Sequence, residues 1–213
     1  MPRFSRENLP FGEVDKAWSL YLSSYLMVRG LERVLLGMKV YGQANIPKEG
    51  RALVAANHRH WLDIFMLPTA IPKRHLSIVA KKEVYDTPIM GTLFSKWESI
   101  PVNRENPGPS TMKEVVRRLK DDRLVGVMPE GTRRQNSELG EMFPGVARWA
   151  YLGDAPTIPA AIRGVDTFGQ AVRGHRAEVV FGEPIDPPSS KDDEPAFMQF
   201  LRSEIQKLVN LKY

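Results

Sequence analysis

The sequence predicts an α/β fold in which a mostly parallel, twisted sheet is flanked by helices and preceded by an amphipathic helical segment. Two observations predict this class. From residue 40 onward, short apolar runs alternate with helical patterns, which is typical of parallel strands joined by crossover helices. Before residue 40, one long stretch has the periodicity of an amphipathic helix. We therefore expect a helical segment over residues 1–39 and a main domain over residues 40–213.

The first element is a helix predicted over residues 12–38. Its longest stretch without a charge, from Ala17 to Val28, has 12 residues, whereas a helix that spans a bilayer needs about 20. We expect the apolar face to lie in a membrane surface with its arginines among lipid phosphates. The alternatives are a helix packed on the core, or one face packed and the other on lipid. The apolar residues at helical spacing are Val14, Trp18, Tyr21, Tyr25, Val28, Leu31 and Leu35.

The elements after this helix follow from apolar runs and their boundaries. A short edge strand is expected at residues 39–42, and strands at residues 53–56, 76–80, 124–128, 157–162 and 178–181. Pro159 interrupts the run at residues 157–162. A proline cannot donate a hydrogen bond within a sheet, so this suggests a sheet edge or a strand end. Thr111 and Glu114 have the spacing of a capping box and predict the start of a helix. The last helix is expected over residues 194–211.

Composition narrows the possible functions. The 213 residues are 42% hydrophobic and 26% charged, as expected of a globular domain with an appendage. The net charge of +5 and the pI of about 9.4 favour anionic partners, namely nucleic acid, anionic membranes or phosphorylated substrates. The chain has no cysteine, which excludes a thiol nucleophile, a disulfide framework and cysteine-based zinc sites. The first residues lack the apolar core of a secretory signal, so we expect a cytosolic catalytic face.

The residues after the strand at 53–56 carry the clearest chemical signal. His58 stands five residues before Asp63, where an open α/β sheet binds ligands at the carboxyl ends of its strands. A histidine held by a carboxylate can take a proton from a hydroxyl near neutral pH. In the alternative interpretation His58 caps a loop and Asp63 caps a helix over residues 64–67.

A second block, Met-Pro-Glu-Gly-Thr-Arg at residues 128–133, favours the catalytic interpretation. With Asn103-Arg104 and the 157–162 run, the two blocks resemble the glycerolipid acyltransferase family, most closely its 1-acylglycerol-3-phosphate acyltransferases. The resemblance spans about residues 40–185 and makes residues 40–213 the expected catalytic domain. It implies that His58 removes the acceptor's proton while Asp63 orients the imidazole. It also implies that residues 157–162 shape the wall of an acyl channel.

The resemblance implies further site residues. The glycine of the second block permits a tight turn, its arginine offers a planar fork for phosphate, and its glutamate holds the loop. His60 stands where many family members have serine. It could compete for the carboxylate, contact a phosphate or pack, and we expect it to support the catalytic pair together with Asn57. The residues expected to bind the acceptor phosphate are Arg104, Glu130, Gly131, Thr132 and Arg133.

The implied activity is transfer of a fatty acyl group from acyl-CoA or acyl-ACP to the free hydroxyl of 1-acylglycerol-3-phosphate, giving phosphatidic acid. No cofactor or metal is expected. The expected partners are the lysophospholipid, the acyl thioester, an anionic membrane surface and acyl carrier protein, with a peripheral location on the cytoplasmic face of the membrane. One alternative is another lyso-lipid or a glycolipid as acceptor. A second is a non-enzymatic basic module for membranes or nucleic acid, but no clustered basic helix or aromatic-basic pattern supports nucleic-acid binding.

Overall fold

The computed structural model describes residues 17–71, 74–103, 108–133, 138–164 and 176–211, with side chains described from residue 23 onward except at residue 35. Residues 12–16 of the predicted N-terminal helix and the candidate ligand Arg104 lie outside the described residues, as do the side chains of Trp18 and Tyr21.

The centre of the molecule is a seven-stranded sheet. In chain order its strands are β1 (Lys39–Tyr41), β2 (Ala52–Ala56), β3 (Leu76–Lys81), β4 (Ile100–Val102), β5 (Leu124–Val127), β6 (Thr157–Arg163) and β7 (Glu178–Phe181). Their order in space is β1-β7-β6-β2-β5-β3-β4. From β6 to β4 all neighbours are parallel, whereas β7 runs antiparallel to β6 and parallel to β1. The predicted fold class, a mostly parallel sheet flanked by helices, is confirmed.

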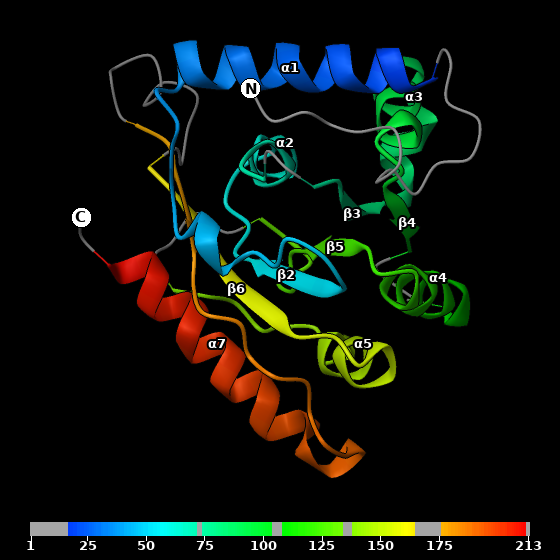
Figure 1. The fold of residues 1–213 in the computed structure, drawn as a ribbon, viewed down its shortest axis with the longest axis vertical. Helices are drawn as coiled ribbons and strands as arrows, with labels where there is room; N and C mark the ends of the chain where they lie inside the picture. The colour runs from blue at the N-terminus through cyan, green and yellow to red at the C-terminus, as the bar shows by residue number, and fades with distance from the viewer. Residues whose placement is uncertain (1–16, 72–73, 104–107, 134–137, 165–175, 212–213) are drawn as a thin grey trace.

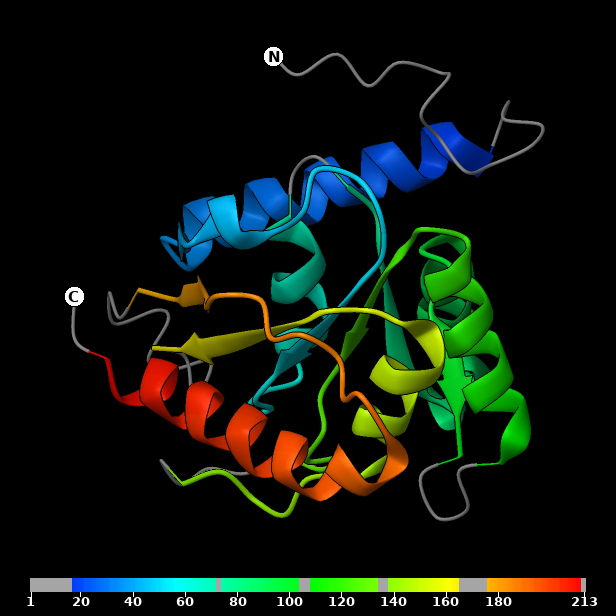
Figure 2. The same cartoon turned by 60° about the horizontal axis from the view of Figure 1, so that its bottom comes forward.

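Helices cover both faces of this sheet (Figures 1 and 2). They are α1 (Ala17–Leu35), α2 (Asp63–Thr69), α3 (Pro88–Lys96), α4 (Pro109–Lys120), α5 (Gly145–Gly153) and α7 (Glu194–Asn210). The structure also has short 3-10 helices, labelled η2 (Gln43–Asn45), η3 (Lys82–Asp86) and η4 (Lys191–Asp193). The first three helices lie on one face, and α4, α5 and α7 on the other.

Strand β2 shows why its sequence is a continuous apolar run. Ala52, Val54 and Ala56 belong to the core under α1, α2 and α3, whereas Leu53 and Ala55 belong to the core under α4, α5 and α7. Every residue of this strand is buried. Alternate side chains of a strand point to opposite faces, so a strand covered on both faces needs apolar residues throughout.

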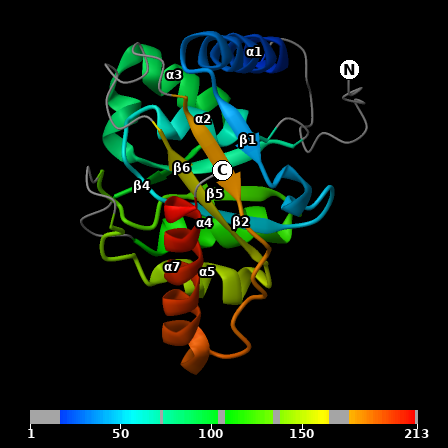
Figure 3. The same ribbon diagram turned by 90° about the vertical axis from the view of Figure 1, so that its left-hand side faces the viewer.

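Helix α1 rests on α2 and α3 along one side (Figure 3). Tyr25 is buried there, and its hydroxyl donates to the carbonyl oxygens of Thr69 and Ile71. The interpretation that put Tyr25 on a membrane-facing surface is therefore wrong, because its hydroxyl pairs with backbone at the end of α2. The opposite side of α1 is also apolar. It exposes Leu26, Met27, Leu31 and Val34.

Two local predictions need correction. Strand β6 lies between β2 and β7 and is not an edge. Pro159 is tolerated because its nitrogen points to the side where β7 has ended, and its carbonyl accepts from Gly182, the residue after that strand. Thr111 is not a cap, since α4 begins at Pro109 and the Thr111 hydroxyl donates to the Pro101 carbonyl at 3.3 Å.

Candidate active site

The catalytic pair follows β2, the 128–133 block follows β5, and the 157–162 run forms most of β6. Because these three strands are adjacent and parallel, their carboxyl ends meet at one edge of the sheet. The fold therefore brings Asn57, Glu130 and Ile162 together although they are separated by up to 105 residues in sequence.

The catalytic loop, residues 57–62, ends where α2 begins at Asp63. Oδ2 of Asp63 is 3.0 Å from Nδ1 of His58 and accepts the backbone N–H groups of Arg59 (2.6 Å) and His60 (2.8 Å). Both side chains of the pair are almost fully buried. Since an ionised carboxylate only accepts, Nδ1 of His58 carries its proton when it donates to Asp63, and Nε2 is the nitrogen that can take a proton from a substrate.

Asn57 fixes the beginning of the catalytic loop. Its side-chain amide donates to the Ile162 carbonyl (2.9 Å), and its oxygen accepts from the Ile162 N–H (2.7 Å). The side chain of Asn57 thereby continues the hydrogen bonding between β2 and β6 beyond the end of β2. Asn57 is 1% exposed, and a buried amide with both partners satisfied holds one geometry.

Glu130 connects the catalytic loop with a more distant segment. Its Oε1 accepts the backbone N–H of His58 at 3.0 Å, and its Oε2 accepts the N–H of Gly140 at 2.8 Å. The carboxylate of Glu130 thus holds the backbone at the catalytic histidine, and both of its oxygens are already used by amides of the chain.

Residues 131–133, the last three of the second block, lie closer to solvent. Gly131 has φ of +65°, a left-handed conformation that glycine adopts readily. Thr132 and Arg133 are exposed, and the Thr132 hydroxyl lies 3.5 Å from the Glu130 carbonyl. Asn103, also exposed, follows β4 directly.

His60 contributes its backbone to the site in addition to its ring. Its N–H contacts the Asp63 carboxylate, while its ring Nδ1 accepts the backbone N–H of Leu62 at 3.3 Å. The ring also lies beside Trp61, with 5.6 Å between the ring centroids. These contacts help to shape the turn between the two catalytic residues.

An apolar groove of about 290 Å³ adjoins the catalytic loop. Trp61 and Leu62 of the loop form one wall, and α1 forms another. None of residues 157–162, expected in the wall of an acyl channel, lines it, because β6 is buried within the core. The groove is lined by Val28, Leu31, Glu32, Leu36, Trp61, Leu62, Phe65 and Leu93.

Glu32 is the charged residue of this lining, and sequence reasoning missed it. It is 4% exposed, and its Oε2 accepts the hydroxyl of Thr69 in α2. Burial raises the pKa of Glu32 to about 7, against the weaker lowering influences of Thr69 and Arg29. The sequence signal was a carboxylate four residues from both Val28 and Leu36, on the buried row of the helix.

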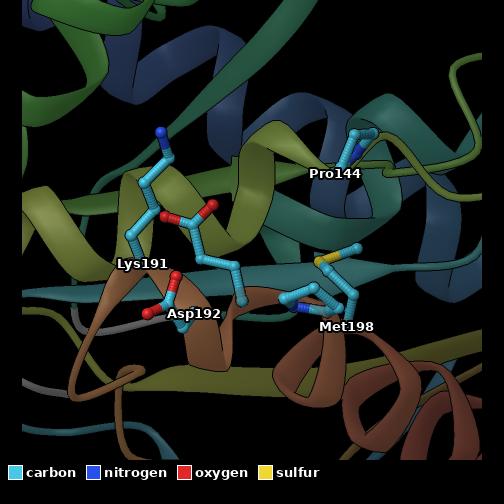
Figure 4. Close-up of a pocket in the computed structure, with 6 residues that line it drawn as sticks. Pro144, Lys191, Asp192 and Met198 are labelled. Atoms are coloured by element: carbon cyan, nitrogen blue, oxygen red, sulfur yellow. The ribbon is translucent and has the colours of Figure 1, made fainter.

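A second hollow, of about 460 Å³, lies between the loop before α5 and the start of α7 (Figure 4). Its lining includes Pro144, directly before α5, and Met198 of α7. None of its lining residues belongs to the catalytic loop or to the 128–133 block. The lining consists of Pro144, Lys191, Asp192, Glu194, Pro195 and Met198.

Two features are absent from the described part of the chain. No group of three or more acidic, histidine or cysteine side chains there is placed to hold a metal ion. Among the described helices, none has the length and apolar character needed to cross a bilayer.

Comparison with known proteins links this geometry to a family. The 1-acyl-sn-glycerol-3-phosphate acyltransferase of Bacillus subtilis is 32% identical over 179 residues, covering 82% of this chain and 89% of that protein. The enzyme of the same name from Streptococcus pneumoniae is 28% identical over 190 residues, covering 85% of this chain and 70% of that protein.

A solved structure has a similar fold. The crystal structure of the 1-acyl-sn-glycerophosphate (LPA) acyltransferase PlsC from Thermotoga maritima matches with a TM-score of 0.69 at 17% identity. The match covers 94% of this chain and 85% of that one. A family model described as Acyltransferase matches residues 37–163, which include the catalytic loop and the Glu130 block. This chain therefore belongs to the acyltransferase family and is an acyltransferase.

Proposed function

We propose that this acyltransferase moves a fatty acyl group from an acyl thioester to the free hydroxyl of 1-acylglycerol-3-phosphate, giving phosphatidic acid. Acyl-CoA and acyl-ACP are the two candidate donors. The observation that carries the proposal is the His58–Asp63 contact of 3.0 Å at the carboxyl edge of the sheet. The names of the relatives in Bacillus subtilis and Streptococcus pneumoniae support the choice of acceptor.

In the proposed mechanism the acceptor hydroxyl attacks the thioester carbonyl directly. Nε2 of His58 takes the hydroxyl proton as the new C–O bond forms, and Asp63 stabilises the imidazolium. The tetrahedral intermediate then collapses, the C–S bond breaks, and the thiolate leaves with the proton that His58 returns. No covalent acyl-enzyme is needed, so the absence of cysteine from the sequence is compatible with this route.

We assign the acceptor's phosphate to the 128–133 block. Arg133 is exposed and can bind phosphate oxygens through two parallel N–H groups. The left-handed turn at Gly131 allows backbone to approach the ligand closely. Arg104 stays a proposed second ligand. Glu130 is better suited to holding the loop, because backbone amides engage both of its oxygens.

We assign a fatty acyl chain to the groove between α1 and the catalytic loop. Its volume of about 290 Å³ and its apolar walls suit a hydrocarbon chain. Trp61 and Leu62 of the wall lie between the two catalytic residues in sequence, so a chain in the groove would start beside the reacting carbonyl.

We further propose that the protein binds the cytoplasmic face of a membrane through the outward side of α1. Met27 and Val34 are exposed there by 61% and 83%, and Arg33 of the same helix is exposed beside them. Exposed apolar side chains and neighbouring arginines on one helix are the features of an interfacial helix. A lysophospholipid could then pass from the bilayer to the groove beneath α1.

The test uses the purified protein with lysophosphatidate in mixed vesicles and supplies acyl-CoA and acyl-ACP in parallel. Mass spectrometry should detect phosphatidic acid from one or both donors. His58→Ala should lower turnover by roughly 10²- to 10⁴-fold, the usual contribution of a general base, without changing the circular dichroism spectrum. A folded His58→Ala protein with wild-type turnover would refute the mechanism. If the protein acylates other lyso-lipids but not lysophosphatidate, the proposed acceptor is wrong.

A further inference from the structure

The backbone of Leu139 and Gly140 is held by side chains of the C-terminal helix. Oε1 of Gln206 accepts the Leu139 N–H at 3.1 Å, and Nη2 of Arg202 donates to the Leu139 carbonyl at 2.6 Å. Nη1 of Arg202 donates to the Gly140 carbonyl. Two side chains one turn apart on α7 thus engage three of the four polar backbone groups of this dipeptide.

The fourth group leads to the catalytic histidine. The Gly140 N–H donates to Oε2 of Glu130, whose Oε1 accepts the His58 N–H. A continuous path of hydrogen bonds therefore runs from α7 through Leu139–Gly140 and Glu130 to the catalytic loop. Each step of this path is a direct hydrogen bond, so a displacement at Leu139–Gly140 would be passed through Glu130 to the backbone of His58.

We infer that Arg202 and Gln206 are positioning residues for His58, acting through Leu139–Gly140 and Glu130. The inference rests on the proposed function, since it assigns these residues to the general base of that mechanism. Neither residue lies within residues 37–163, the part matched by the acyltransferase family model. The residues that position His58 therefore include two on α7, a helix that follows the part matched by the family model.

Other contacts keep α7 docked when Arg202 or Gln206 is replaced. Phe197, Leu201 and Ile205 are buried in the core beneath α4, α5 and α7. Arg148 of α5 forms an ion pair of 2.8 Å with Glu194 at the start of α7. The variants Arg202→Ala and Gln206→Ala are therefore expected to fold, and their effect on turnover can be separated from loss of the helix.

The first experiment compares Arg202→Ala with Arg148→Ala in the 213-residue protein. Both remove an arginine that ties α7 to the body, but only Arg202 contacts Leu139–Gly140. We expect Arg202→Ala to lower kcat about tenfold or more with the KM for the acyl donor unchanged, because small misplacements of a catalytic group can cost up to about 10²-fold. Arg202→Lys should restore part of kcat. Arg148→Ala should lower Tm and leave kcat within about twofold.

The second experiment is a double-mutant cycle with Glu130→Gln. If the residues act along one path, Glu130→Gln combined with Arg202→Ala should lose little more kcat than the worse single variant. Fold-losses that multiply would overturn the inference, as would equal loss of kcat in Arg148→Ala and Arg202→Ala. The variant His58→Ala distinguishes failure of the positioning role from failure of the proposed function. If it is inactive while Arg202→Ala keeps wild-type kcat, only the positioning role fails; if it is active, the proposed function fails first.

Discussion

Oδ2 of Asp63 accepts three hydrogen bonds, one from the His58 ring and two from the backbone of the loop between them. The carboxylate therefore both orients the imidazole and determines the shape of the catalytic loop. This double use explains why a neutral replacement of the same size should be damaging.

Asp63→Asn should lower kcat by about 100-fold or more, because an amide supplies no charge and can present N–H groups where an acceptor is needed. The measurement is kcat with saturating substrates, accompanied by a thermal unfolding curve. A folded Asp63→Asn protein that retains more than half of the wild-type kcat would show that the carboxylate is not needed.

Arg133→Ala should raise the KM for the phosphate-bearing acceptor by about tenfold or more while the KM for the donor stays unchanged. Arg133→Lys should recover only part, because lysine lacks the planar fork. Arg51→Ala is the matched control, since Arg51 pairs with Asp122 at the opposite edge of the sheet. An effect confined to the donor KM would contradict the assignment.

Among single residues, the sequence predicted contacts between residues that are close together in the chain. His58 and Asp63 are five residues apart, and this spacing together with the 128–133 block predicted a catalytic pair. Gln206 and Leu139 are 67 residues apart, and Glu32 and Thr69 are 37 apart. No local pattern marks either contact, because each depends on how helices pack over the sheet.

Among the elements, α1 shows most clearly where periodicity is insufficient. The helix was predictable, but both of its sides are apolar, so the pattern did not reveal which side meets the core. Tyr25 pairs with the end of α2, whereas Val34 points outward. Strand β6 gives a similar case. Whether Pro159 marks an edge depends on where the neighbouring β7 ends.

Met27→Ser combined with Val34→Ser should weaken binding to anionic vesicles and lower turnover of vesicle-borne acceptor. Activity on a short-chain, water-soluble acceptor should be retained. Leu152→Ser with Phe200→Ser is the matched control, because both side chains are exposed on helices of the opposite face. Vesicle sedimentation at low and high salt measures binding, and equal binding by both double variants would contradict the membrane role of α1.

For the whole molecule, Glu32 connects stability to pH. The pKa of Glu32 in the folded protein is about 7, above the ordinary value of 4.5, because the side chain is buried. The folded protein therefore holds this proton more tightly than the unfolded chain. The raised pKa of Glu32 contributes to the free energy of unfolding. This contribution is fully present below about pH 4.5 and is lost as the pH rises through about 7. The loss in the free energy of unfolding is on the order of 3 kcal/mol, because one pKa unit corresponds to about 1.4 kcal/mol.

Glu32→Gln should remove this component because glutamine stays neutral. Urea unfolding between pH 4.5 and 8 should show the variant gaining stability over wild type as pH rises. Glu49→Gln, at an exposed carboxylate, is the control and should run parallel to wild type. Parallel curves for Glu32→Gln and wild type would contradict the role of the buried proton.

The double hydrogen bond between Asn57 and Ile162 has a consequence for biosynthesis. It joins positions 105 residues apart, and β1 likewise pairs with β7, near the other end of the chain. Contacts of such long range form slowly and only after both partners have been synthesised. A chain still emerging from the ribosome carries the catalytic histidine long before it carries β6, β7 or α7. The nascent protein should therefore remain without activity until β6, β7 and α7 have been synthesised.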